Sequence, residues 1–206
     1  MSRLTAFAAL RILGILALFQ LRPSIVAAQD SAPQPRRWEV RIASGSLIPT
    51  GEQRSAVRSA NLTAAQLAWL PRPSLAVTGT FGWARSRDLR FADRPKLDVF
   101  TSDLGVEVRP TTWFAGRAAT FSPFVGAGAG ARSYDSRSHG EGATHNLSGY
   151  AALGGELGAG RFALRLEVRD YASGFKPLAG VGTVDARNDV VVMAALRFNR
   201  RADVRR

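Results

Sequence analysis

The chain has 206 residues, the size of one domain after removal of a leader, and it carries a formal net charge of +12 at pH 7. It contains no cysteine, which excludes a disulfide framework, thiol chemistry and a lipid anchor on a cysteine. Most of the 28 basic residues are arginine, so the chain is expected to be attracted to acidic surfaces such as phosphorylated lipid head groups. Binding to nucleic acid is not expected, because no motif for it is recognisable.

The N-terminal residues have the features of a secretory signal peptide. Arg3 and Arg11 flank an apolar stretch, residues 12–19 continue it, and small residues precede a cleavage position at Ala28. The apolar run is less than half of the roughly 20 residues that a membrane-spanning helix needs. We therefore expect residues 1–28 to be a cleavable signal peptide, cut between Ala28 and Gln29, and residues 29–37 to be a periplasmic linker.

Eight segments then alternate between apolar and polar residues. They are 38–48, 62–70, 75–85, 98–109, 121–133, 147–157, 162–171 and 189–198. In the seventh, Phe162 and Leu164 fall on one side of a strand, whereas Arg165 and Glu167 fall on the other, because strand side chains alternate faces. No segment shows a helical repeat of comparable length, so the sequence predicts an all-β fold.

The connections between these segments alternate in length. Residues 49–60, 86–97, 134–146 and 172–188 form long connections, 71–73 and 158–160 form short ones, and 110–120 is intermediate. Outer-membrane barrels have short periplasmic turns and longer extracellular loops, and an even number of strands returns both termini to one side. The pattern predicts an eight-stranded antiparallel up-and-down transmembrane β-barrel over residues 38–198, with N- and C-termini in the periplasm and a basic tail at 199–206.

Alternation alone does not say which face points outward, since a soluble lipocalin-like barrel has its aliphatic face inside. Three features favour an outward aliphatic face. The segments are close to the roughly 9–11 residues that cross a bilayer when tilted. Large aromatic residues, such as Trp38, Trp83 and Phe162, lie towards strand ends, as in interfacial girdles. The polar face combines glycine with acid and arginine, which suits a narrow interior of paired charges.

This orientation assigns residues to the two faces. The expected structural charge network of the lumen comprises Glu39, Arg41, Asp103, Glu107, Arg109, Glu156, Arg165, Glu167, Arg169 and Arg197. The expected lipid-facing residues include Val40, Ile42, Val106, Val108, Phe162, Leu164, Leu166, Val168, Val190, Val192 and Leu196. Eight strands leave an interior just wide enough for side chains, so a diffusion pore is not expected.

Several motifs resemble those of a known family. They are Trp38-Glu-Val-Arg-Ile, Leu47-Ile-Pro-Thr-Gly51, the run Phe-Ser-Pro-Phe-Val-Gly-Ala-Gly-Ala-Gly at 121–130, and a last strand ending Leu196-Arg-Phe198. The mature chain thereby resembles the small outer-membrane β-barrel domains of the OmpA/OmpX type. The resemblance implies that the strand ending at Phe198 is the assembly signal read by the barrel assembly machinery, although residues 199–206 follow it.

Residues for catalysis or metal binding are few. His139, Glu141 and His145 have the side chains of a metal site, but they lie in a polar loop without a rigid support. A barrel enzyme acting on lipid A needs a histidine beside a serine at a strand end, yet no His-x-Ser lies on a strand and Ser133 is six residues from His139. The glycines at 126–130 lack the Gly-Lys-Ser/Thr step of a phosphate loop. We therefore assign no catalytic, cofactor-binding or metal residue.

The sequence thus predicts a monomeric, non-enzymatic barrel of a Gram-negative-type outer membrane, with a structural or surface-interaction role. Its expected partners are outer-membrane lipid, lipopolysaccharide and, during biogenesis, the barrel assembly machinery, while an external partner stays unidentified. The basic loop at 85–96 is a candidate contact for sugar phosphates or a solvated loop. Two alternatives stay open, namely a lipid A-modifying barrel enzyme and a secreted soluble lipocalin-like barrel that binds a small apolar ligand.

Overall fold

The computed structural model describes residues 38–110, 112–115, 119–136, 143–159, 162–175 and 185–198. All of them belong to one unit of the chain, Gln34–Arg206. The predicted signal peptide, its cleavage site, the linker and the basic tail lie outside the described residues and stay predictions. Among the described residues, no helix is long and apolar enough to cross a membrane.

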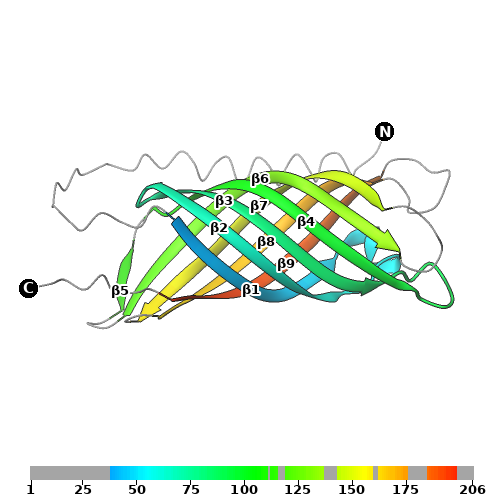
Figure 1. The fold of residues 1–206 in the computed structure, drawn as a ribbon, viewed down its shortest axis with the longest axis horizontal. Helices are drawn as coiled ribbons and strands as arrows, with labels where there is room; N and C mark the ends of the chain where they lie inside the picture. Colours follow the sequence, from blue (N-terminus) through cyan, green and yellow to red (C-terminus); the bar gives the residue numbers. More distant parts are fainter. Residues whose placement is uncertain are drawn as a thin grey trace, which may run out of the picture. The chain divides into compact units, whose positions relative to one another are not determined.

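Eight long antiparallel strands form a closed barrel (Figure 1). They are β1 (Trp38–Pro49), β2 (Ala60–Arg72), β3 (Leu75–Arg87), β4 (Lys96–Val108), β6 (Ala119–Ser136), β7 (Thr144–Ala159), β8 (Phe162–Phe175) and β9 (Asp185–Phe198). Neighbours along the chain pair with each other, and the pairing of β1 with β9 closes the barrel. The predicted all-β, up-and-down architecture is confirmed.

The short strand β5 (Trp113–Ala115) is not part of the barrel wall. It pairs only with the first residues of β6, while β4 pairs directly with β6 through the rest of the wall. A 3-10 helix, η2 (Gly51–Ser55), occupies the first long connection, and it begins at Gly51 with a φ of 61°. Neither element was predicted, since each is too short to show a periodic pattern.

The strands are longer than the sequence predicted. They run from 12 residues in β1 to 18 in β6. The prediction ended β6 at Ser133, whereas the strand continues to Ser136. The predicted ends followed the apolar alternation, but backbone pairing continues through polar residues such as Tyr134 and Asp135, which pair with β4. The long connections are correspondingly shorter than predicted. They all leave from one end of the barrel, which we call the long-connection end.

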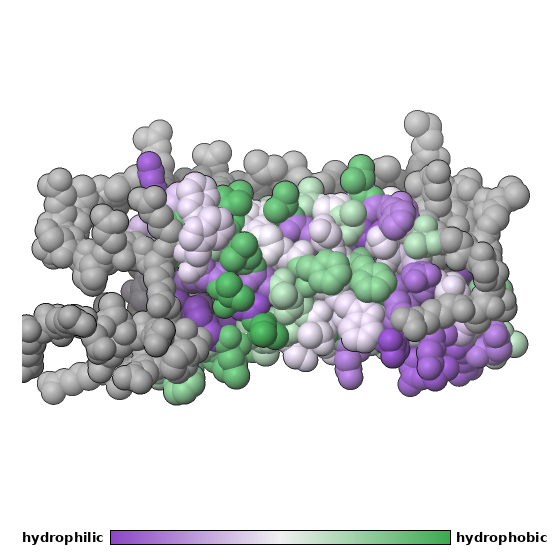
Figure 2. Space-filling view, in the orientation of Figure 1, coloured by the Kyte–Doolittle hydropathy of each residue, from purple (hydrophilic) through white to green (hydrophobic). Residues whose placement is uncertain are grey.

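The two faces of the wall differ in chemistry, and the apolar one points outward. Ile42 and Leu104 are exposed, while the residues on either side of each are buried. Figure 2 shows hydrophobic residues along the middle of the barrel, with hydrophilic residues gathered at the long-connection end. All of the predicted lipid-facing residues that are described with side chains lie on this outward face.

The register keeps the faces in phase around the closure. Ile42 on β1 lies opposite Ala65 of β2 on one side and opposite Leu196 of β9 on the other, and all three point outward. A slip of one residue would exchange the faces of a whole strand, so the alternation itself specifies the register. The orientation is the reverse of a soluble lipocalin-like barrel, which keeps its aliphatic face inside.

Candidate functional sites in the lumen and at the rim

Charged side chains of both signs fill the barrel interior. Among the described residues, the network includes six arginines and six carboxylates, and the ten residues predicted for the lumen are part of it. They are Arg41, Arg109, Arg132, Arg165, Arg169 and Arg197, with Glu39, Asp103, Glu107, Glu156, Glu167 and Asp189. Sequence reasoning left Arg132 and Asp189 out of the network. Arg132 lies in the fifth predicted segment, but no local pattern identified its partner, which is 57 positions away on another strand.

Glu107 is the centre of the first cluster. The Arg165 guanidinium donates to both of its carboxylate oxygens, with Nη2 at 2.6 Å and Nη1 at 3.2 Å. Arg109 donates from Nε at 2.8 Å, and Arg41 Nη1 lies 3.8 Å away. Arg165 also donates to Glu167 at 3.0 Å. Bidentate pairs of this kind are stronger than neutral hydrogen bonds and fix the geometry of both side chains.

A second cluster forms around Arg169. Its Nε donates to Glu167 at 2.6 Å, and its Nη1 donates to Asp103 at 3.2 Å. The hydroxyl of Tyr171 donates to the same carboxylate of Asp103 at 2.6 Å. Glu167 thus joins the two clusters, because it accepts from Arg165 as well as from Arg169. The result is a continuous chain of alternating charge along the barrel axis.

Aromatic rings complete the packing of the arginines. The guanidinium carbon of Arg165 lies 3.5 Å from the ring centre of Phe124, and that of Arg169 lies 4.6 Å from the ring centre of Tyr150. Arg132, which also pairs with Asp189, lies 3.9 Å from the ring of Tyr171. Stacking on aromatic faces is favourable for a desolvated guanidinium, and it fills space that small polar side chains would leave open.

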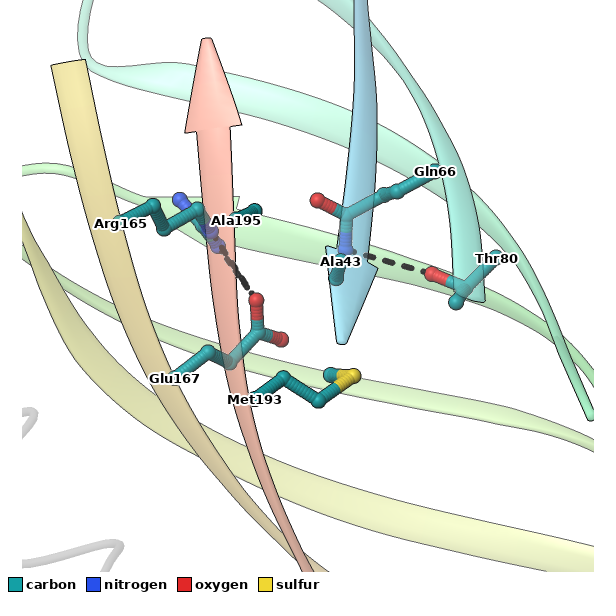
Figure 3. A pocket seen from close by; sticks show the side chains of 7 residues that line it. All are labelled: Ala43, Gln66, Thr80, Arg165, Glu167, Met193 and Ala195. Atoms are coloured by element: carbon teal, nitrogen blue, oxygen red, sulfur yellow. Dashed lines mark hydrogen bonds and ion pairs between the residues drawn. The ribbon is translucent and has the colours of Figure 1, made fainter. Parts of the chain in front are cut away.

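Little free volume remains between these side chains. Figure 3 shows a cavity in the lumen beside the Arg165–Glu167 pair, lined also by Gln66, Thr80 and Met193. Its volume is about 10 Å³, hardly the space of one water molecule. At this level the polar side chains of the lumen pack closely around that small space.

The second candidate site is a hollow at the long-connection end of strands β1 to β4, which we call the rim hollow. Its volume is about 440 Å³. It is lined by Ser46, Arg58, Ser59, Ala60, Asn61, Arg85, Ser86, Arg87 and Lys96. The lining thus includes four cationic side chains and no carboxylate. Arg85, Arg87 and Lys96 belong to the predicted basic loop, whereas Arg58 and the polar residues of β1 and β2 were not connected with it by sequence.

A third feature is a serine–histidine pair on the outward face. Ser133 of β6 and His145 of β7 are partners in the strand register, and Ser133 Oγ lies 2.6 Å from His145 Nδ1. No His-x-Ser motif lies on a described strand, as expected, but the pairing of β6 with β7 brings a histidine beside a serine by a route that the motif search did not consider. The two residues are separated by 12 positions and a connection, so only the β6–β7 pairing brings them together. His139 and Glu141 of the possible metal set lie outside the described residues.

A comparison with protein-family models and with curated protein sequences finds no match. Among solved structures, Neisserial surface protein A is similar with a TM-score of 0.52 and 10% identity, over 79% of this chain and 97% of that one. Outer membrane protein OprG from Pseudomonas aeruginosa is similar with a TM-score of 0.52 and 13% identity, over 78% of this chain and 94% of that one. At such low identity the similarity concerns the fold. The chain has the fold of the eight-stranded outer-membrane β-barrels.

Proposed function

We propose that the protein is a monomeric barrel of the outer membrane with a non-enzymatic role in the structure or surface interactions of the envelope. The observation that carries the proposal is the combination of a packed, charge-balanced lumen with an outward aliphatic face. Val40, Ile42 and Leu104 are each about 70% exposed in the isolated chain. Exposure of such apolar side chains is unfavourable in water and favourable in contact with lipid. The paired lumen supports a scaffold rather than a pore.

The lengths of the connections support one orientation in the membrane. We infer that the long-connection end, with η2 and the β3–β4 connection, faces the outside of the cell, whereas the short-turn end and both termini face the periplasm. We also infer that the barrel assembly machinery inserts the chain and reads the last strand up to Phe198. The backbone of that strand completes the barrel by pairing with β8 along its length.

Membrane location is tested by fractionation. The protein should sediment with outer membranes, should resist extraction by salt and should require detergent for release. Recovery from the soluble periplasm without detergent would contradict the proposal and favour a soluble barrel. Purified protein in a planar bilayer should show no stable conductance, because the lumen is filled; steady ionic steps would contradict the scaffold role.

Orientation is tested by cysteine labelling, which is clean because the chain has no cysteine of its own. Ala92→Cys lies in the β3–β4 connection and Ser74→Cys in the β2–β3 turn, and both positions are exposed. A membrane-impermeant maleimide should label intact cells carrying Ala92→Cys and spare those carrying Ser74→Cys. The opposite result would show that the barrel is inserted with the reverse orientation.

A second candidate function rests on the Ser133–His145 pair. We infer that this pair fits nucleophilic attack on the ester of a lipid, as in a lipid A-modifying barrel enzyme. Nδ1 of the histidine would take the serine proton while Oγ bonds to the ester carbon; the alcohol would leave with that proton, and water would then release the acid from the serine. Its location on the outward face near a strand end supports access for a lipid.

This candidate is tested with the purified protein in micelles that contain lipid A or a fatty acyl ester. Release of fatty acid should be lost in Ser133→Ala and in His145→Gln, and retained in Ser102→Ala, an outward serine of β4. Loss in all three variants would indicate a general defect of the barrel. If the unaltered protein releases no acid from either substrate, the enzymatic candidate fails and the scaffold role is unaffected.

A further inference from the structure

We propose that the rim hollow binds the phosphate group of a membrane lipid whose acyl chains lie against the aromatic residues next to it. The proposal rests on the outer-membrane role argued above and names the partner chemistry of its surface interactions. The ligand is an anionic amphiphile, with one end phosphorylated and the other apolar.

The charges of the rim hollow are not neutralised by the protein. Within the described part of the chain, Arg58, Arg87 and Lys96 form no ion pair with a carboxylate. The fourth cation, Arg85, donates to Asp98 at 3.2 Å, but its side chain keeps 47% exposure. A concave surface lined by cations raises the local concentration of anions, and a phosphate accepts several charge-assisted hydrogen bonds at once.

The cationic side chains stand on ordered backbone. The backbone N–H of Arg58 donates to the carbonyl of Arg87 at 3.1 Å, and the Ser86 hydroxyl donates to the carbonyl of Arg58 at 2.5 Å. Arg87 and Lys96 belong to strands β3 and β4. Hydroxyls of Ser46 and Ser59 and the amide of Asn61 add neutral donors to the lining. A site on paired strands holds its donors more precisely than a loop does.

The register places two of the cations against each other. Arg87 and Lys96 are direct partners of the β3–β4 pair, and both are exposed on the outward side. Like charges directly opposite each other on one face of a sheet are unfavourable for folding. Both charges attract an anion placed between them, so the register concentrates positive potential at this side of the hollow.

The position of the rim hollow points to a lipid rather than to a free anion. Trp83 precedes Arg85 by two residues on the outward face of β3, and the Arg85 guanidinium lies 4.9 Å from its ring centre. Phe81 follows on the same face towards the middle of the barrel, with the Phe100 ring 6.3 Å away. Aromatic girdles mark the boundary between lipid head groups and acyl chains. The cations therefore lie at head-group level, directly beside a surface for acyl chains.

The test measures binding to the full-length protein in zwitterionic micelles by tryptophan fluorescence. The probes are a short-chain phosphatidic acid, a phosphatidylcholine with the same chains, and inorganic phosphate. We expect saturable binding of phosphatidic acid that weakens with salt, and much weaker binding of the other two. Equal affinity for inorganic phosphate would overturn the lipid assignment, and equal affinity for the zwitterionic lipid would overturn the phosphate site.

Matched variants assign the binding to the rim hollow. Arg58→Gln/Lys96→Gln should bind phosphatidic acid at least roughly tenfold more weakly, because it removes two charge-assisted donors. The control, Arg54→Gln/Arg72→Gln, removes the same charge from exposed positions outside the hollow and should bind as the unaltered protein does. An equal loss of affinity in both variants would mean that net charge alone causes the effect, and it would overturn the site. The two proposals fail separately. Fractionation tests location in the membrane, whereas binding in micelles tests the site and does not depend on location in the cell.

Discussion

The lumen and the rim hollow are both rich in arginine, yet their electrostatics are opposite. In the lumen each arginine lies beside a carboxylate, as with Arg165 and Glu107, and the side chains of this pair are at most 5% exposed. In the rim hollow, Arg58 and Lys96 are exposed and have no carboxylate partner among the described residues. One residue type thus packs a core in one region and presents uncompensated charge in the other. Whether an arginine is neutralised thus depends on whether a carboxylate of another strand lies within reach of it.

The physical reason is the cost of removing charge from water. A buried charge without a partner costs several kcal/mol, so the lumen requires acids and arginines in equal number. At the rim, water solvates each cation, and an exposed charge has little effect on stability whether it is paired or not. The comparison therefore predicts that changes of charge affect folding in the lumen, and ligand binding at the rim.

The largest effect is expected from unpairing the lumen. Glu107→Gln should lower the free energy of unfolding by about 3–5 kcal/mol, because it leaves the buried guanidiniums of Arg165 and Arg41 and the half-buried one of Arg109 without their shared carboxylate. Urea titration of the refolded barrel, followed by tryptophan fluorescence, measures the change. Glu52→Gln on η2 is the exposed control and should stay within about 0.5 kcal/mol. A similarly small change for Glu107→Gln would show that the lumen is hydrated.

The next effect concerns the outward face at mid-barrel. Leu166→Arg should destabilise the protein in vesicles by about 2–4 kcal/mol, because it places a cation towards the middle of the lipid layer. Leu147→Arg is the control near the long-connection end of β7, where about 0–1 kcal/mol is expected. The fraction of folded barrel is measured by its gel mobility without heating. Tolerance of Leu166→Arg, together with a severe effect of Arg165→Leu, would reverse the assignment of faces.

A smaller effect is expected where the lumen is tightest. A Cβ at Gly128 would meet the Tyr150 ring, with Cζ at 2.7 Å, and would overlap the backbone carbonyl oxygen of Leu104. Gly128→Ala should therefore cost about 1–3 kcal/mol through overpacking. Gly149→Ala, on the outward face, meets nothing nearer than 3.8 Å and serves as the control. Equal urea midpoints for the two variants would mean that Tyr150 moves aside freely and that the lumen is loosely packed.

The smallest effect is expected at the rim. Arg58→Gln should change the free energy of unfolding by less than about 0.5 kcal/mol, since its exposed side chain has no ion pair to lose. The same urea titration checks this value against the unaltered protein. A loss of more than about 1 kcal/mol would show that the rim charges contribute to folding, and the contrast between the two regions would no longer hold.

Much of the architecture could be predicted from local pattern. Phe162, Leu164, Arg165 and Glu167 alternate because neighbouring side chains of a strand point to opposite faces, and the first two are exposed whereas the last two are buried. Strand ends were predicted less well, since β6 continues through polar residues to Ser136 by backbone pairing alone. Backbone pairing of this kind does not produce a hydropathy pattern in the sequence. The short elements β5 and η2 do not produce one either.

The candidate sites were predicted only in part. Ten charged residues of the lumen were identified, without Arg132 and Asp189, but their pairings were not, because partners such as Arg165 and Glu107 are separated by 58 positions. The Ser133–His145 pair was missed for the same reason, as a search for motifs along the chain does not compare residues on adjacent strands. The rim hollow also combines residues from four strands and the connection before β2.

The sequence by itself determined the wall of this protein: eight alternating segments, an apolar face and a charged face, and a balance of acids and arginines within the charged one. These properties are local, because they depend on the chemistry of neighbouring residues in a strand. Only the tertiary structure decided which arginine meets which carboxylate, that serine and histidine lie side by side, and that Arg58 joins Arg87 and Lys96 in one hollow. Those contacts follow from the register of each strand pair and from the closure of β1 on β9, which bring together residues that are distant along the chain.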